Sequence, residues 1–162
     1  MKFVRYLAHG DISYGVVDGN IVREITNNPF DSFVITDHIH PLSDVKILAP
    51  SLPGKILAVG LNYRSHLGER PPLKEPLIFL KTPTSLIGPE ESIVLPRNFS
   101  GRVDEEGEVV AVIKDRCKNI SKEEALKHVL GYTCGNDVSA RDWQREDGQW
   151  WRAKSSDTFS VA

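Results

Sequence analysis

The sequence predicts a mainly β protein of the α+β class, with a few short helices. Short strand-like runs separated by turn signals fill residues 1–50, and this spacing is typical of strands. His-Pro, Ala-Pro and Leu-Pro steps follow between residues 38 and 53, and each proline biases the residue before it toward extended backbone. Further apolar runs recur beyond residue 55. We therefore expect strands in both parts of the chain.

The first fifty residues predict a small β-rich module. Strands are expected over residues 2–8, 12–17 and 21–25, with a turn at Asp18-Gly19-Asn20 between the last two. The proline-rich segment marks the boundary, which divides the chain into an N-terminal module over 1–52 and a larger domain over 53–162.

The larger domain is predicted to combine more strands with two helical stretches. The run at 56–60 is continuously apolar, which is typical of a buried strand. One or two helical turns are expected over 62–69, ended by Pro71-Pro72, and a helix over 122–129 with Ser121 and Glu124 as a capping box. The other expected strands are 77–80, 92–95, 108–113, 131–134 and 159–161.

Composition and charge exclude several classes of protein. The 162 residues are 40% hydrophobic and 26% charged, the balance of a soluble globular protein. A net charge of −2 without basic runs argues against nucleic-acid and anionic-membrane partners. Cys117 and Cys134 are too few for a disulfide framework and lack zinc-site spacing. With no signal or membrane-spanning segment in the sequence, we expect a cytoplasmic protein.

An acidic cluster offers candidate metal ligands. Glu106 and Glu108 lie two positions apart at the start of a predicted strand, so their carboxylates share one face, where a cation would relieve their repulsion. Asp137 follows another predicted strand and offers a third oxygen ligand of the kind that Mg²⁺ prefers. Taken alone, the glutamates also fit a solvated acidic turn, and Asp137 fits a turn or N-cap aspartate.

Other polar residues are candidates for catalysis or binding. His66 and Glu69 are three positions apart, which on a helix would form a proton relay or, equally, an exposed ion pair. Lys154 follows Trp150-Trp151, whose bulk could desolvate its ammonium or hold it beside an anionic substrate, although a surface lysine is the alternative. The side chains suited to contact carboxylate or carbonyl oxygens are Lys81, Arg141 and Gln144.

Five segments together resemble the fumarylacetoacetate hydrolase family in order and approximate spacing. The resemblance covers about residues 55–162 and implies a rolled, mixed β-sheet, with the preceding residues as the family's variable N-terminal module. Family members usually continue well past the matched lysine, so we expect this chain to lack the C-terminal third. The segments are Gly60-Leu61-Asn62-Tyr63-Arg64-Ser65-His66-Leu67-Gly68-Glu69, Pro76-Leu77-Ile78-Phe79-Leu80-Lys81, Asp104-Glu105-Glu106-Gly107-Glu108-Val109, Asn136-Asp137-Val138-Ser139-Ala140-Arg141-Asp142 and Ala153-Lys154-Ser155.

The resemblance also implies roles for individual positions. Glu106, Glu108 and Asp137 match the family's ligands for Mg²⁺, Mn²⁺ or Ca²⁺. His66 and Glu69 match its water-activating pair on a lid segment, and Lys154 matches a lysine close to the substrate. Substrate contacts are expected from Lys81, Arg141 and Gln144.

The expected reaction is a metal-dependent hydrolysis of a C–C bond in a small 2-oxo acid, such as an acylpyruvate or fumarylpyruvate. By resemblance, the metal stabilises the pyruvate enolate, His66 activates water, and a homodimer acts in the catabolism of aromatic compounds. One alternative is an isomerase or decarboxylase of a related 2-hydroxy-diene-dioate or 2-oxo acid. Others are an inactive module that keeps the ligands, or a β-rich binding domain whose acidic residues form a solvated turn.

Overall fold

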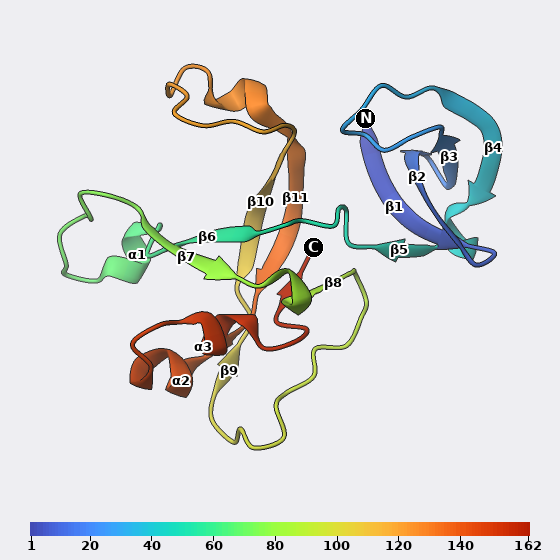
Figure 1. Ribbon diagram of the computed structural model, residues 1–162. Helices are drawn as coiled ribbons and strands as arrows, with labels where there is room; N and C mark the ends of the chain where they lie inside the picture. Colours follow the sequence, from blue (N-terminus) through green and yellow to red (C-terminus); the bar gives the residue numbers. More distant parts are fainter.

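Five antiparallel strands form the N-terminal sheet, in the order β4-β3-β2-β1-β5. The computed structural model describes residues 1–162, and Figure 1 shows this sheet, in blue, to one side of the remaining chain. The strand predictions over 2–8 and 21–25 are confirmed, and the strand over 12–17 is one residue longer at each end. The bounds are Lys2–Ala8 (β1), Asp11–Asp18 (β2), Ile21–Ile25 (β3), Ile35–Pro41 (β4) and Lys46–Leu48 (β5).

The core of this sheet is built around Tyr6, whose side chain is fully buried. Val22 is buried on the same face, because side chains alternate along each strand and the register pairs Tyr6 with Ser13 and Val17 with Val22. Val16 is buried on the opposite face of the sheet. The Tyr6 hydroxyl donates to Glu24 Oε2 at 3.2 Å. Burial and then the neighbouring Glu24 carboxylate both disfavour the phenolate, which raises the pKa of Tyr6 to about 12.

Two antiparallel strands, β6 (Ile56–Gly60) and β7 (Leu77–Lys81), form a ribbon that carries α1 (Arg64–Leu67) in its connection. In Figure 1 the ribbon leads away from the N-terminal sheet toward α1. The expected strand over 56–60 is confirmed, but it is not buried on both faces. Leu57 is 59% exposed and Val59 is 44% exposed, because a two-stranded ribbon is covered on one face only.

A four-stranded mixed sheet, β10-β11-β13-β8, forms the centre of the larger domain. The last strand, β13, pairs antiparallel with the end of β11 and parallel with β8. A separate short ladder joins β9 to β12. The bounds are Leu86–Ile87 (β8), Val103–Asp104 (β9), Gly107–Ile113 (β10), Val129–Asp137 (β11), Ser139–Ala140 (β12) and Ser160–Val161 (β13).

Two short helices, α2 (Arg141–Glu146) and α3 (Trp151–Ser155), follow β12 and pack against each other. Their inner faces close a small apolar core of Val138, Ala140, Ala153 and Phe159. Phe99, Val103 and Trp143 pack around that core. None of the helices in the structure is both long and apolar enough to cross a membrane.

Two elements expected from the sequence do not form. The predicted helix over 122–129 is a single 3₁₀ turn, Ala125–His128, although Ser121 Oγ does accept the backbone N–H of Glu124 at 3.3 Å. Leu126 in this turn is 72% exposed, so no buried apolar face offsets the cost of starting a helix. The predicted strand over 92–95 is extended but pairs with no other strand.

The N-terminal sheet contacts the larger domain through β5. Lys46 Nζ lies 2.6 Å from Glu91 Oε1, and the other carboxylate oxygen of Glu91 accepts the backbone N–H of Gly88 at 2.8 Å. Gly88 follows β8 directly. The N-terminal sheet is thereby linked to the mixed sheet that carries β11.

We expect Phe159→Ala to lower the free energy of unfolding by about 3 kcal/mol or more, because it removes a fully buried aromatic ring from a small core. Urea denaturation followed by circular dichroism measures the change. Leu126→Ala serves as the control and should have little effect, because Leu126 is largely exposed. Equal effects of the two substitutions would contradict the assignment of this core.

Tyr6 should ionise only at strongly alkaline pH, because its pKa is raised to about 12. Since the folded-state pKa is raised, the stability contributed by Tyr6 is complete below the ordinary tyrosine pKa of about 10. That contribution is lost as the pH rises toward about 12. Titration of phenolate absorbance should show a late step that Tyr6→Phe removes and Tyr132→Phe retains. A late step present in both variants would contradict the assignment.

Candidate active site

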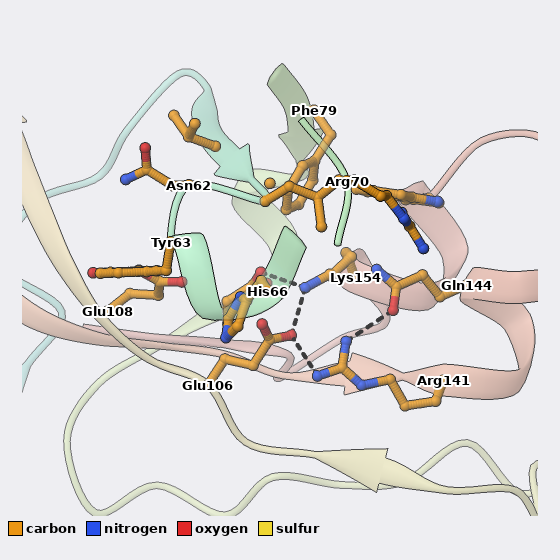
Figure 2. Close-up of a pocket in the computed structure, with 15 residues that line it drawn as sticks. Asn62, Tyr63, His66, Arg70, Phe79, Glu106, Glu108, Arg141, Gln144 and Lys154 are labelled. Carbon is orange, nitrogen blue, oxygen red and sulfur yellow. Dashed lines mark hydrogen bonds and ion pairs between the residues drawn. The ribbon is translucent and has the colours of Figure 1, made fainter. Parts of the chain in front are cut away.

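A cavity of about 410 Å³ is lined by residues from β6, α1, β7, β10, β11, α2 and α3. Its volume is in the range typical of small-molecule sites. All the site residues predicted from the sequence line it except Lys81 and Glu69. Figure 2 shows Glu106, Arg141 and Lys154 directed toward one another, with His66 nearby.

Glu106 and Asp137 are brought together by backbone bonds between neighbouring segments. The backbone N–H of Asp137 donates to the carbonyl of Glu106 at 2.9 Å. Asn136 Oδ1 in turn accepts the backbone N–H of Glu106 at 3.0 Å. The end of β11 thus fixes the residue that immediately precedes β10, and Glu108 follows two positions later on that strand.

The ammonium of Lys154 lies between the two carboxylates. Lys154 Nζ is 2.7 Å from Glu106 Oε1 and 2.6 Å from Asp137 Oδ2. Its side chain is only 3% exposed, and its Nζ lies 5.2 Å from the ring centroid of Phe79. Trp150 packs edge-on against that ring. Phe79 rather than the tryptophan pair therefore covers the ammonium, which is a buried group and not a surface lysine.

Lys81 lies behind Asp137 and does not line the cavity. Its ammonium is buried, pairs with Asp137 Oδ1, and donates to the carbonyl of Phe159 at 3.0 Å. Burial lowers the pKa of Lys81, and Asp137 opposes that shift without cancelling it. In this structure Lys81 pairs with Asp137 and holds its carboxylate in place, outside the cavity lining.

Arg141 connects the acidic cluster to α2. Its Nε lies 2.8 Å from Asp104 Oδ2 and its Nη2 lies 3.1 Å from Glu106 Oε1. Its Nη1 donates to Gln144 Oε1 at 2.8 Å, which leaves the amide NH₂ of Gln144 available to a ligand. The pair expected to contact substrate thus lines the cavity as one hydrogen-bonded unit.

The pKa values of the two glutamates move in opposite directions. Desolvation alone would raise the pKa of Glu106, but hydrogen bonds from Lys154 and Ser139 outweigh it, and the pKa of Glu106 is lowered. The pKa of Glu108 is raised, first by desolvation and then by the like charges of Asp137 and Glu106. Glu108 is therefore the acidic group with the greatest need of a cationic partner.

The donor atoms suit a hard divalent cation, which prefers carboxylate oxygens. Lys154, Ser139 and Arg141 all contact Oε1 of Glu106, so its Oε2 is free of protein partners. The Glu108 carboxylate has no hydrogen bond or ion pair in the structure. However, no three His, Cys, Asp or Glu side chains converge closely enough to surround an ion. The expected ligands share a cavity, with an ammonium between two of them.

His66 and Glu69 do not form the expected pair. α1 ends at Leu67, and Gly68 has φ 58° and ψ −126°, a backbone conformation that a residue with a Cβ rarely adopts. Glu69 therefore lies beyond the helix, outside the cavity lining, and makes no hydrogen bond or ion pair with His66. His66 does line the cavity, with its ring 5.8 Å from that of Tyr63.

Two family models together match nearly the whole chain. The family model described as fumarylacetoacetate (FAA) hydrolase C-terminal matches residues 55–162, and that described as Rv2993c-like, N-terminal, matches residues 1–50. The chain belongs to the fumarylacetoacetate hydrolase family. Protein Rv2993c of Mycobacterium tuberculosis is 44% identical over 98% of this chain and 63% of its own length.

Two further relatives in the fumarylacetoacetate hydrolase family are named for an enzymatic activity. Oxaloacetate tautomerase FAHD2A of Bos taurus is 45% identical over 96% of this chain and 47% of its own length. The structure of 2-hydroxyhepta-2,4-diene-1,7-dioate isomerase from Mycobacterium marinum superposes with a TM-score of 0.89 at 40% identity, over 99% of this chain and 63% of that chain. The fold prediction is confirmed, and the chain spans less than two thirds of the length of these relatives.

The cavity also contains residues that the sequence reasoning did not assign. Asn62 and Tyr63 belong to the first family segment, whose order could have pointed to them. Trp150 approaches Gly60 so closely that a Cβ there would lie 3.0 Å from its ring, a packing requirement without a sequence signal. Arg70 lies just beyond that segment, and no pattern in the sequence singles it out.

We expect Lys154→Met to lower the free energy of unfolding by about 3 kcal/mol, because it leaves two mostly buried carboxylates facing each other without a cation. Lys127→Met, which removes an ammonium from an exposed pair with Glu124, should cost less than about 1 kcal/mol. Chemical denaturation in metal-free buffer at neutral pH measures both. Similar losses would show that the Lys154 contacts are no stronger than a surface pair.

Proposed function

We propose that this chain carries the catalytic cavity of an enzyme that acts on a small 2-oxo acid with the help of a divalent cation. The observation that carries the proposal is that three carboxylates, a buried ammonium and an imidazole line a single cavity. The isomerase and tautomerase named among its relatives support an enzyme of this kind.

Glu106, Glu108 and Asp137 would hold the cation, with Mg²⁺ favoured over Mn²⁺ or Ca²⁺. The free Glu106 Oε2 and the unpartnered Glu108 carboxylate support this choice, because a hard cation binds such oxygens. When bound, the ion would supply positive charge where the keto oxygen of the substrate becomes negative.

The chain's own residues would orient the substrate. The Gln144 amide can donate to a substrate oxygen, while Arg141 holds Gln144 and adds positive charge to the same wall. Lys154 lies deeper, where its low exposure strengthens its attraction to a substrate anion. Phe79 and Trp150 supply the apolar wall that excludes water on the other side.

The specific reaction that we propose is hydrolysis of a C–C bond in an acylpyruvate-like substrate. His66 would remove a proton from water as the oxygen attacks the distal carbonyl carbon. The bond between that carbon and the pyruvate unit then breaks, its electron pair passes to the pyruvate unit as an enolate, and that enolate takes up a proton. The products are a carboxylic acid and pyruvate.

Isomerisation or tautomerisation of a 2-oxo acid is the second candidate, with decarboxylation as a related outcome. The separation of His66 from Glu69 favours it, because proton transfer between carbon and oxygen needs one base, whereas the expected water activation uses the pair. His66 would remove a proton from the carbon beside the keto group and return it elsewhere on the same molecule.

A homodimer remains a proposal drawn from the resemblance. Exposed apolar side chains on the outer face of the β6–β7 ribbon support it: Leu57, Val59, Ile78 and Leu80 are 44–59% exposed. Such a face is of the kind that another protein surface covers.

Calorimetric titration of metal-free protein with Mg²⁺ tests the ligand set. Glu108→Gln should weaken binding at least about tenfold, because it removes one of three anionic ligands. Glu105→Gln removes the same charge from an exposed neighbour outside the cavity and should bind like the unaltered protein. Equal affinities for the two variants would overturn the assignment.

Turnover assays on the same samples test the reaction. An acylpyruvate should be split into an acid and pyruvate, whereas oxaloacetate should only exchange between its enol and keto forms in a tautomerase. His66→Asn should abolish either activity while Mg²⁺ affinity stays unchanged, because His66 acts on protons. Full activity in this variant would exclude His66 as the base.

A further inference from the structure

The cavity is lined by one lysine and two arginines, Lys154, Arg141 and Arg70. Arg70 differs from the other two in its contacts. Lys154 is engaged by Glu106 and Asp137, and Arg141 is engaged by Asp104 and Glu106. The Arg70 guanidinium lines the same cavity and has no hydrogen bond or ion pair to any side chain. It therefore presents a full set of donors that the protein itself does not use.

The backbone holds Arg70 at this position. Leu67 is buried at the end of α1 and its carbonyl accepts the backbone N–H of Arg70 at 3.1 Å. Gly68 makes the sharp turn between them, and Pro71 fixes φ immediately after Arg70. The segment that carries Arg70 is thus anchored on both sides, while its guanidinium is free.

Two groups of opposite charge in the cavity remain unpartnered and do not pair with each other. Glu108 lies at the acidic side with Tyr63, whereas Arg70 lies on the side of Gln144 and Phe79 (Figure 2). Arginine remains charged at all physiological pH values and its planar fork matches a carboxylate. With a cation bound at Glu108, a ligand that carries an anionic group at each end would satisfy both sides of this cavity, one end at the cation and the other at Arg70.

We propose that Arg70 is a specificity-determining residue that binds the second carboxylate of a 2-oxo dicarboxylic acid, remote from the 2-oxo acid group. This assignment rests on the proposed function, because the first carboxylate and keto oxygen occupy the acidic side with the cation. The preferred substrates are then diacids, and mono-acids of the same length bind without the Arg70 contact.

Binding of two four-carbon acids in the presence of Mg²⁺ tests the assignment. Oxaloacetate and 2-oxobutanoate share the 2-oxo acid group and differ by a carboxylate in place of a methyl. Quenching of tryptophan fluorescence reports binding, since Trp150 lines the cavity. The unaltered protein should bind oxaloacetate about tenfold or more tightly than 2-oxobutanoate, the effect of one charge-assisted bidentate contact.

Arg70→Gln should remove this preference by weakening oxaloacetate about tenfold, with 2-oxobutanoate changed by less than about twofold. Arg70→Lys keeps the charge without the fork and should retain part of the preference. Arg64→Gln is the matched control, because Arg64 is an exposed arginine of α1 outside the cavity lining. Circular dichroism verifies that each variant is folded. We expect all of them to fold, because Arg64 and Arg70 are both exposed.

The outcomes separate this inference from the proposed function. Equal affinity of the unaltered protein for both acids, or equal weakening of both by Arg70→Gln, overturns the role of Arg70 and leaves the proposed function standing. If Arg64→Gln weakens oxaloacetate binding as much as Arg70→Gln does, the role of Arg70 is also overturned, because the loss would then come from the removal of a positive charge in general and not from a specific contact. Binding of neither acid overturns the proposed function and this inference with it.

Discussion

The buried ammonium of Lys154 is the interaction on which the geometry of the cavity depends. Without a cation, the carboxylates of Glu106 and Asp137 would repel each other strongly in a setting with little water. Lys154 comes from α3, Glu106 immediately precedes β10, and Asp137 ends β11. One charged group therefore fixes the relative positions of a helix and two strands, and it does so inside the cavity.

The Lys154 ammonium also divides the cavity carboxylates into those that it contacts and one that it does not. Glu106 and Asp137 both contact the ammonium of Lys154, whereas the Glu108 carboxylate has no such contact. The pKa of Glu108 is raised by desolvation and by the like charges of Asp137 and Glu106. A divalent cation that entered the cavity would be attracted most strongly to the Glu108 carboxylate, which has no cationic partner. It could also bind the free Oε2 of Glu106. Lys154 balances part of the negative charge, so the carboxylates of Glu106 and Asp137 stay together without any further cation.

Patterns in the sequence correctly predicted those strands whose formation depends mainly on residues close by in the chain. β1, β3 and β6 follow from apolar runs bounded by turn residues, and the shared face of Glu106 and Glu108 follows from the two-residue period of a strand. The helix after Ser121 failed although its cap was present, because burial of its apolar face needed a partner that the fold does not supply. Burial of Lys81 and exposure of Arg70 likewise depend on residues distant in the chain, so no local pattern shows them.

The contacts that place Asp137 also determine when the cavity can assemble during folding. Lys81 reaches Asp137 across 56 positions and the carbonyl of Phe159 across 78, and Ser85 bonds to Ser160 across 75. Contacts between such distant segments form only after large loops have closed, and proteins rich in them fold slowly. The N-terminal sheet, whose strands are linked by short connections, can form early. The cavity is then a late product of folding, completed when β13 enters between β8 and β11.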